Sequence, residues 1–179
     1  KILSLPENGS LRLGGLAVAI GQEIPAASIP QLNFSTPSDW NGDTSFEWDA
    51  SDGRAYAAVF AQALITVAAV NDAPQVANPI PDQETTSLLL YAYTIPAATF
   101  SDVEADALTL TATLSDGASL PAWLTFDGTA LNGIPPVDAA GTWVIRIQAD
   151  DAHGGLASDK FTLLVTSLLK TIHLPMITR

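Results

Sequence analysis

Apolar and polar residues alternate at every second position along most of this chain. In Leu108–Leu114, Leu and Ala residues occupy one set of alternate positions and Thr residues occupy the other. Residues 143–149 and 161–165 repeat the pattern, with apolar rows that begin at Trp143 and Phe161. Because successive side chains of a β-strand point to opposite faces, these segments predict antiparallel strands that each bury one face.

Turn-forming residues separate the alternating segments. Pro, Gly, Asn and Asp recur about every 8–12 residues, and no segment has the helical period of about 3.6 residues. Asn-Gly or Asp-Gly pairs occupy positions 41–42, 52–53, 116–117, 127–128 and 132–133. Glycine accepts the positive φ angles of tight hairpins, so each pair predicts a turn. Together these features predict an all-β fold of the sandwich or barrel type.

The two halves of the chain contain the same local pattern. An Ala-x-Asp sequence ends an apolar strand at residues 50–52 and again at residues 149–151. Each copy is followed by a short polar turn and a closing strand, at 64–67 and at 161–165. This repetition predicts two β-modules in series. The expected domains are residues 1–70, residues 71–167 and a C-terminal tail at 168–179, and Val70–Pro74 forms the join.

The composition narrows the classes of function. The chain has 179 residues, of which 47% are hydrophobic, and its net charge is −12. The hydrophobic content excludes disorder, and the negative charge argues against nucleic acid as a partner. No apolar run approaches the roughly 18 residues that cross a bilayer, so membrane insertion is not expected. The chain has no cysteine, which excludes disulfides and zinc–thiolate sites.

Six residues with oxygen-bearing side chains are candidate metal ligands at the join. They are Asn71, Asp72, Asp102, Glu104, Asp106 and Asp151. Ca2+ takes about six to eight oxygen ligands, so convergence of these side chains predicts one or more calcium ions. On an extended strand the three acidic residues of 102–106 would not share a face, but an irregular loop can turn all three inward.

Two other interpretations of these residues compete with a calcium site at the join. Asn71, Asp72 and Asp102 could instead serve as turn and strand-end residues that accept nearby backbone N–H groups. An EF-hand is excluded, because Ala107 and Thr113 stand where that loop requires Gly and Glu. A calcium site of the join type and a purely structural role therefore both remain open.

A series of motifs in the second half carries a family resemblance. In order they are Asn71–Pro74, Ile80–Gln83, Thr99–Asp102, Leu120–Asp127, Leu131–Pro135 and Ala149–Asp151. Residues 71–166 resemble the dystroglycan-type cadherin-like, or Ig-like, modules of bacterial surface proteins. The resemblance implies a cadherin-like β-sandwich in an adhesin, a repetitive surface protein or the accessory region of an extracellular enzyme. It also implies calcium ligands from the linker, from the acidic loop and from Asp151, whereas Asp106 either joins them or caps its turn.

Residues 1–70 resemble the later part of another tandem module, of the cadherin-like or chondroitin-sulfate-proteoglycan-repeat kind. The matching segments are Leu5–Leu11, Trp40–Phe46 and Ala50–Gly53. Such modules begin well before the first of these segments, so the first sandwich is expected to lack its N-terminal strands. Open strand edges invite pairing with another strand. Residues 168–179 are a candidate donor strand for a neighbouring subunit, and a frayed terminus is the alternative.

These observations favour a non-enzymatic role. His153 and His173 do not accompany a nucleophile motif such as Gly-x-Ser-x-Gly, and phosphate loops are absent from the sequence. The expected function is an extracellular structural or adhesive segment at the bacterial cell surface. Calcium would stiffen its inter-module joint, and its partners would be neighbouring modules or identical subunits.

The alternative is a carbohydrate-binding accessory module that recognises polysaccharide. Four tryptophans could provide stacking platforms for sugar rings. Trp48 and Trp143 fall on rows expected to point inward, and Trp123 lies within the core motif. This leaves Trp40, beside a predicted turn, as the one tryptophan expected to be exposed.

Overall fold

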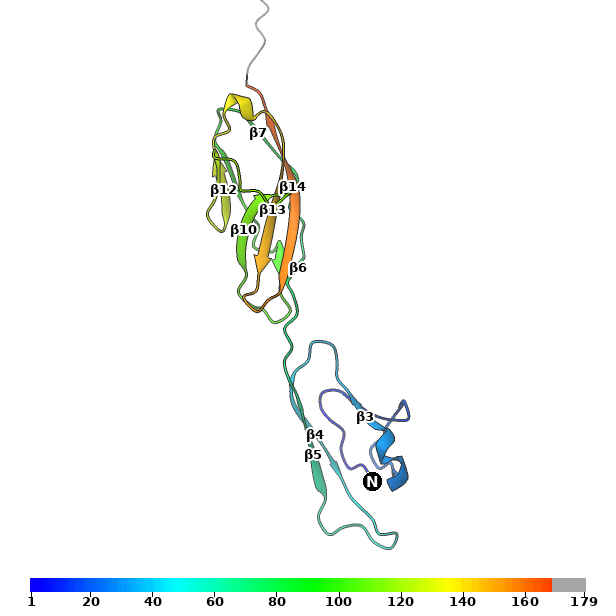
Figure 1. The fold of residues 1–179 in the computed structure, drawn as a ribbon. Helices are drawn as coiled ribbons and strands as arrows, with labels where there is room; N and C mark the ends of the chain where they lie inside the picture. The colour runs from blue at the N-terminus through cyan, green and yellow to red at the C-terminus, as the bar shows by residue number, and fades with distance from the viewer. Residues whose placement is uncertain (169–179) are drawn as a thin grey trace, which may run out of the picture. The chain divides into compact units, whose positions relative to one another are not determined.

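The computed structural model describes residues 1–168, and the predicted donor strand in the tail lies almost entirely outside them (Figure 1). The chain divides into two compact units, residues 1–70 and the part from Asn71 onward. Strands dominate both units, which confirms the all-β prediction. Two short 3-10 helices, η1 (Ala26–Gln31) and η2 (Val137–Ala139), are the helical elements of the described residues, and neither was predicted. No helix in this part of the chain is long and apolar enough to span a membrane.

The first unit contains two small antiparallel sheets. One has the strand order β2-β1-β3 and the other consists of β4 and β5. The strand bounds are β1 Ser10–Leu13, β2 Leu16–Ala17, β3 Leu32–Ser35, β4 Gly42–Trp48 and β5 Ala61–Val67. The core is small, with Ile2, Leu11, Val18 and Phe46 as its buried hydrophobic residues. The register of β4 and β5 runs from Gly42 opposite Val67 to Trp48 opposite Ala61.

The second unit contains a four-stranded sheet, β10-β13-β14-β7, and a three-stranded sheet, β11-β12-β8, with an additional pair, β6-β9 (Figure 1). The strands of the larger sheet are β7 Gln83–Thr86, β10 Thr109–Leu114, β13 Gly141–Asp150 and β14 Leu156–Thr166. The others are β6 Gln75–Val76, β8 Tyr91–Thr94, β9 Phe100–Ser101, β11 Leu124–Phe126 and β12 Ala130–Gly133. All pairs are antiparallel except β7 with β14, which run parallel.

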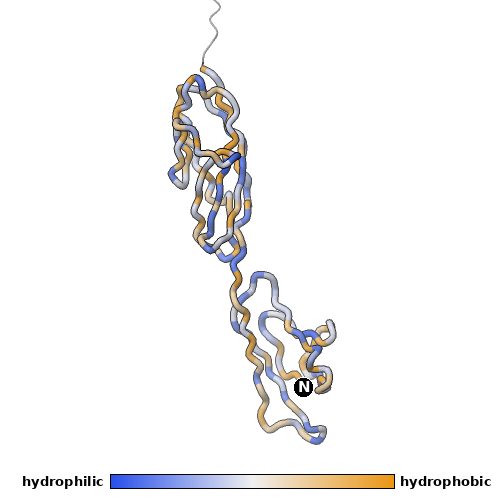
Figure 2. Tube along the Cα trace, viewed as in Figure 1, coloured by the Kyte–Doolittle hydropathy of each residue, from blue (hydrophilic) through white to orange (hydrophobic). Residues whose placement is uncertain are grey.

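The core of the second unit follows the predicted alternation. Figure 2 shows hydrophobic and hydrophilic residues alternating along the chain. The alternate residues Ile145, Ile147 and Ala149 of β13 are fully buried, and Phe161, Leu163 and Val165 of β14 are buried beside them. These residues and Leu131 belong to one apolar cluster that draws on both sheets. The inward rows predicted for 143–149 and 161–165 are therefore confirmed.

Two carboxylates fasten the segment before β7 to the edge of β14. Asp159 Oδ2 accepts the Ile80 backbone N–H at 2.6 Å, and Asp82 Oδ1 accepts the Thr162 backbone N–H at 2.7 Å. Unpaired N–H groups at a sheet edge need acceptors, and these side chains supply them where the parallel ladder has not yet begun. Along the chain, β7 is the first strand of the larger sheet and β14 is the last. Side-chain hydrogen bonds and main-chain hydrogen bonds therefore both join these two strands.

The prediction of a turn at Asn132-Gly133 is wrong. These residues end strand β12, where Gly133 lies opposite Leu124 of β11. A Cβ atom added to Gly133 would lie 2.0 Å from the Trp123 carbonyl oxygen. The glycine is needed for close approach of two backbones rather than for a positive φ. At the other four predicted pairs, the glycines have positive φ angles of 90–125°.

Candidate metal centre

Three of the predicted ligands converge in the loop between β9 and β10. Asp102, Glu104 and Asp106 each place a carboxylate oxygen within 4.8 Å of the others. Asp102 Oδ1 accepts the backbone N–H groups of Glu104 at 3.0 Å and Asp106 at 3.2 Å. Ala105 has a left-handed φ of 62°, which tightens the turn. The loop therefore curls around Asp102, and side chains that would diverge on a strand point to a common centre.

The second carboxylate oxygen of Asp102 is buried. Oδ2 has no hydrogen-bond partner among the described residues. A carboxylate oxygen withdrawn from water without a donor is unfavourable, and a bound cation is one way to compensate it. This orphaned oxygen and the two neighbouring carboxylates form an oxygen-rich, negatively charged centre of the kind that a hard cation such as Ca2+ prefers.

The predicted residues Asn71 and Asp151 pair with each other at the same end of the unit. The Asn71 Nδ2 amide donates to Asp151 Oδ2 at 2.9 Å, although the residues lie 80 positions apart. Asp151 Oδ1 accepts the backbone N–H groups of His153 at 2.7 Å and Gly155 at 2.9 Å. Asp151 is only 1% exposed, and these three donors occupy both of its oxygens. In this arrangement Asp151 holds Asn71 in place beside the turn that follows β13.

Two contacts connect this pair to the acidic loop. The Asp72 backbone N–H lies 3.4 Å from Glu104 Oε2, and His153 Nδ1 lies 3.1 Å from Asp106 Oδ2. The structure thus brings all six predicted residues to one end of the second unit, although only three of them cluster as carboxylates. His153 was not predicted. Its position two residues after Asp151, in the same turn, was the one available signal.

The hydrogen bonds around Asp151 favour its charged form. The side-chain bond from Asn71 lowers the pKa of Asp151 below its ordinary value of 3.8. The backbone N–H groups of His153 and Gly155 act in the same direction, against the opposing effect of burial. Asp151 is therefore ionised at neutral pH, and its stabilising contribution is lost only as the pH falls below 3.8 and through the lowered pKa.

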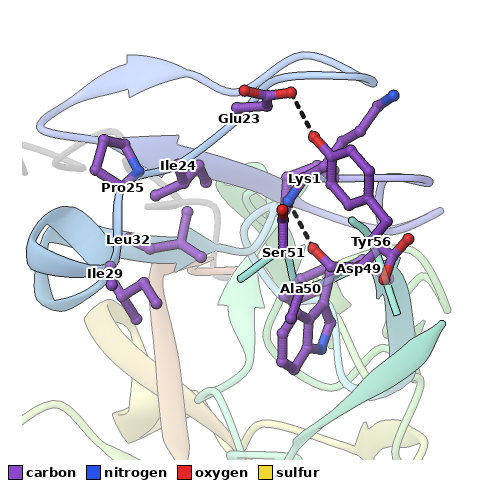
Figure 3. A pocket seen from close by; sticks show the side chains of 14 residues that line it. Lys1, Glu23, Ile24, Pro25, Ile29, Leu32, Asp49, Ala50, Ser51 and Tyr56 are labelled. Atoms are coloured by element: carbon purple, nitrogen blue, oxygen red, sulfur yellow. Dashed lines mark hydrogen bonds between the residues drawn. The ribbon is translucent and has the colours of Figure 1, made fainter. Parts of the chain in front are cut away.

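The first unit contains a separate cavity of about 730 Å3 (Figure 3). Its apolar wall includes Ile24, Ile29 and Leu32, and the Tyr56 ring lies on the opposite side. Trp48 is a second aromatic residue of the lining. The Tyr56 hydroxyl donates to a Glu23 carboxylate oxygen. The Lys1 ammonium group lies 5.4 Å from the centre of the Tyr56 ring. The cavity is thus apolar inside and has charged groups at its rim.

The prediction that Trp40 is the exposed tryptophan is wrong. Trp40 is half-buried, whereas Trp48 is 38% exposed. Trp48 follows the inward alternation of Thr44 and Phe46, but it is the last residue of β4 and the cavity lies over it. Its ring therefore faces an open space instead of a packed core.

The two sheets and the apolar core of the second unit indicate the class of protein. Two sheets that enclose one apolar core form a β-sandwich, which is the architecture of immunoglobulin-like and cadherin-like domains. The family described as "Putative Ig domain" matches residues 73–166, which is more than half of the 179 residues. The chain belongs to this family, and the resemblance drawn for residues 71–166 is confirmed.

Several solved structures show a distant likeness. An endo-fucoidan hydrolase of glycoside hydrolase family 107 is 25% identical, with a TM-score of 0.42 over 77% of this chain and 20% of its own. Drosophila N-cadherin EC1-3 is 9% identical, with a TM-score of 0.44 over 94% of this chain and 56% of its own. The insect immune protein hemolin is 15% identical, with a TM-score of 0.44 over 92% of this chain and 39% of its own.

This chain spans only a fifth of the length of the first of these structures. With TM-scores below 0.5, none of the three likenesses supports an inference about what this chain binds. No curated protein matches the sequence.

Proposed function

We propose that this chain is a non-enzymatic structural or adhesive segment of an extracellular bacterial surface protein or fibre, and that it binds calcium. Membership of the Ig-like family supports the structural role. The observation that carries the calcium proposal is the convergence of Asp102, Glu104 and Asp106 around a buried, unpaired Asp102 oxygen. Copies of the chain, or neighbouring modules, are the proposed partners.

Each residue of the site has a distinct role in this proposal. Asp102, Glu104 and Asp106 would supply carboxylate oxygens, and water would complete the coordination that Ca2+ requires. Asp72, whose backbone already contacts Glu104, is a candidate for a further ligand. Asn71 and Asp151 act as positioning residues in this proposal, because their hydrogen bond holds Asn71 beside the turn from which His153 contacts Asp106.

Calcium would act here by neutralising charges that repel one another. Three carboxylates within 4.8 Å disfavour a tight loop, and a divalent cation removes that cost. Because Glu104 also contacts the backbone of Asp72, an ordered loop would restrict the first residues of the second unit. The proposed consequence is a stiffer joint immediately after Val70.

Calcium is expected to raise the thermal midpoint of the second unit. A ligand that binds only the folded state at about a hundred times its Kd adds about 2.7 kcal/mol, or about 10–20 °C for a unit of this size. The measurement is the thermal midpoint by scanning calorimetry, after treatment of the protein with a chelator and then at increasing calcium concentrations. Asp102→Asn should remove the shift. Asp127→Asn, which changes a turn carboxylate bonded to Thr129 and Ala130, should retain it. A midpoint independent of calcium would reject the metal site.

Carbohydrate binding is a second candidate function, and the cavity of the first unit favours it. Trp48 and Tyr56 are partly exposed aromatic residues of the lining, on which a sugar can stack. Glu23 and Asp49 also line the cavity and can accept hydrogen bonds from sugar hydroxyl groups. A volume of about 730 Å3 is within the range of small-molecule sites.

Replacing Trp48 with alanine tests this candidate by affinity electrophoresis in soluble neutral and sulfated polysaccharides. If the cavity binds sugar, the wild type is retarded and Trp48→Ala loses at least about tenfold in affinity, because stacking on an aromatic ring supplies much of such binding. Trp40→Ala, a change to the half-buried tryptophan, is the matched control and should remain retarded. Equal mobility of all three proteins in every polysaccharide would reject the candidate.

A further inference from the structure

Two basic side chains lie next to each other on the outer face of the larger sheet. Residues 71–168 contain twelve Asp or Glu residues and two Lys or Arg residues, which are Arg146 and Lys160. Arg146 lies on β13 and Lys160 on β14, and the two are direct register partners. Ile145 and Phe161, their neighbours in sequence, are buried in the core. Both basic side chains therefore point to the opposite face of the sheet, away from the core.

The geometry of the ladder brings these two residues close together. The Thr162 N–H and the Thr166 carbonyl both form hydrogen bonds on the β7 side of β14. Lys160 follows the same alternation, so its backbone groups also point away from β13, and its pair with Arg146 is of the non-hydrogen-bonded type. Facing residues of this type have Cα atoms about 4.5 Å apart, and their side chains are the closer kind of cross-strand neighbours.

The two positive charges are not neutralised by ion pairs within the described residues. The ion pair of this part of the chain joins His153 and Asp106, and no carboxylate pairs with Arg146 or Lys160. Acidic residues on or beside these strands accept backbone N–H groups instead; they are Asp82, Asp150 and Asp159. Like charges directly opposite each other on a sheet are destabilising. The unit therefore keeps a repulsive pair of cations although acidic residues outnumber basic ones sixfold in its sequence.

Uncharged hydrogen-bonding side chains surround the pair. Arg146 Nε donates to Thr113 Oγ1 at 3.3 Å, which directs the guanidinium towards β10. Polar residues at neighbouring register positions point to the same face; they are Thr111, Gln148, Ser158 and Thr162. Hydroxyl and amide groups can donate hydrogen bonds to an oxyanion and can also exchange hydrogen bonds with sugar hydroxyl groups.

We propose that Arg146 and Lys160 bind an acidic group of a polysaccharide, a carboxylate or a sulfate ester, on the outer face of the larger sheet. A guanidinium binds such an oxyanion through two N–H groups, and an ammonium group adds a compact charge with three donors. The bound anion offsets the repulsion between the two cations, so binding removes a cost that the free protein bears.

The distribution of charge favours a polysaccharide over other anionic partners. Nucleic acids and anionic membranes present dense negative charge, which the net charge of −12 repels. Two adjacent cations match one acidic group at a time. The hydroxyl and amide groups around them match the uncharged hydroxyl groups that separate the acidic groups of a sugar chain. A sparsely charged polysaccharide offers both features.

This site goes beyond the functions proposed above and is independent of both sites described there. The cavity belongs to the first unit, and neither basic residue belongs to the acidic cluster. Binding of an acidic oligosaccharide should therefore persist in Trp48→Ala and in Asp102→Asn. Its failure can be told apart from a failure of the cavity or of the calcium site.

Isothermal titration calorimetry with three oligosaccharides tests the choice of ligand. The probes are hyaluronan, whose acidic groups are carboxylates, κ-carrageenan, whose acidic groups are sulfate esters, and neutral dextran. The protein is first treated with a chelator, so that no calcium ion bridges it to the ligand. We expect saturable binding of at least one acidic oligosaccharide and none of dextran, and the one that binds more tightly identifies the acidic group. Absence of binding to both acidic probes at millimolar concentration would overturn the proposal, as would equal binding of dextran.

Substitutions of the cation pair locate the binding site. Arg146→Gln and Lys160→Gln should each weaken binding at least about tenfold, because each removes one of the two charges that face the anion. Arg54→Gln removes the same charge from an exposed loop of the first unit and should bind as the wild type does. Equal losses in all three variants would show that net charge alone governs binding and would overturn the site.

The charge reversal Lys160→Glu separates binding from stability. It places a carboxylate opposite Arg146, so it should abolish binding without lowering the thermal midpoint, because opposite charges facing each other on a sheet are favourable. Circular dichroism checks that the variant is folded. Wild-type affinity in Lys160→Glu would overturn the proposal. So would self-association of the wild type that this substitution abolishes, because that result assigns the cations to acidic groups of another copy.

Discussion

Replacing Gly155 with alanine is expected to destabilise the second unit and to abolish its response to calcium. A Cβ atom at this position would lie 2.1 Å from Asp151 Oδ2 and 2.7 Å from the Ala73 Cα atom. Relief of this overlap requires residues 71–74 to move away from the 151–155 turn, which breaks the bond between Asn71 and Asp151. Overpacking of this kind costs about 1–3 kcal/mol, and the lost buried hydrogen bond adds about 1–3 kcal/mol.

The neighbouring Gly154 provides a matched control for this prediction. A Cβ atom there would meet nothing within 4 Å, although its φ of 103° imposes strain on alanine. Gly154→Ala should therefore lower stability by about 1–2 kcal/mol and keep the calcium-induced rise of the thermal midpoint. Urea unfolding gives both free energies, and calorimetry with and without calcium gives the shifts. A Gly155→Ala protein with an unchanged calcium shift would show that the position of Asn71–Pro74 does not matter for the metal.

Replacing Phe161 with alanine should lower the free energy of unfolding by about 3–5 kcal/mol. Phe161 is 2% exposed in the centre of β14, and its ring lies 6.1 Å from that of Tyr93 on the opposing sheet. Truncation would leave a cavity between the two sheets that the rigid strands on either side cannot close. Urea unfolding measures the loss and is followed by tryptophan fluorescence, to which Trp123 and Trp143 of this unit contribute.

Leu164 lies on the same strand and on the other face, so Leu164→Ala is the control. It is 40% exposed, and its truncation should cost less than about 1 kcal/mol. Equal losses for the two variants would mean that the core between the sheets is not the main source of stability in this unit. The comparison keeps the strand the same and changes the face of the sheet.

The rows of core residues could be predicted because each row consists of every second residue of a single strand. Burial of Ile145, Ile147 and Ala149 follows from a period of two and one dry face. The same rule failed at Trp48, which has the inward parity of Phe46 but no packed neighbour beyond the strand end. The alternation along a strand gives the face to which a side chain points. Burial also requires other side chains packed against that face, and these come from residues distant in the sequence.

In the candidate site, too, contacts between residues close in sequence could be predicted, whereas contacts between distant segments could not. Asp102, Glu104 and Asp106 lie within five residues, so their convergence could be inferred from a short irregular loop. The pairing of Asp106 with His153 and the enclosure of Asp151 by backbone donors depend on how the turn after β13 meets that loop. The role of Gly133 was missed for a similar reason, because Asn-Gly is a turn signal in isolation and only the approach of Trp123 shows otherwise.

The parallel pairing of β7 with β14 has a mechanical consequence. The chain enters the second unit just before β6 and leaves the described part just after β14. Tension applied at Asn71 and Leu168 would slide β7 and β14 past each other along their length, so their ladder bonds and the contacts of Asp82 and Asp159 are loaded together. Bonds loaded in shear break collectively, whereas an antiparallel hairpin pulled from its open end unzips one bond at a time. This unit is therefore expected to resist extension when force is applied along the chain.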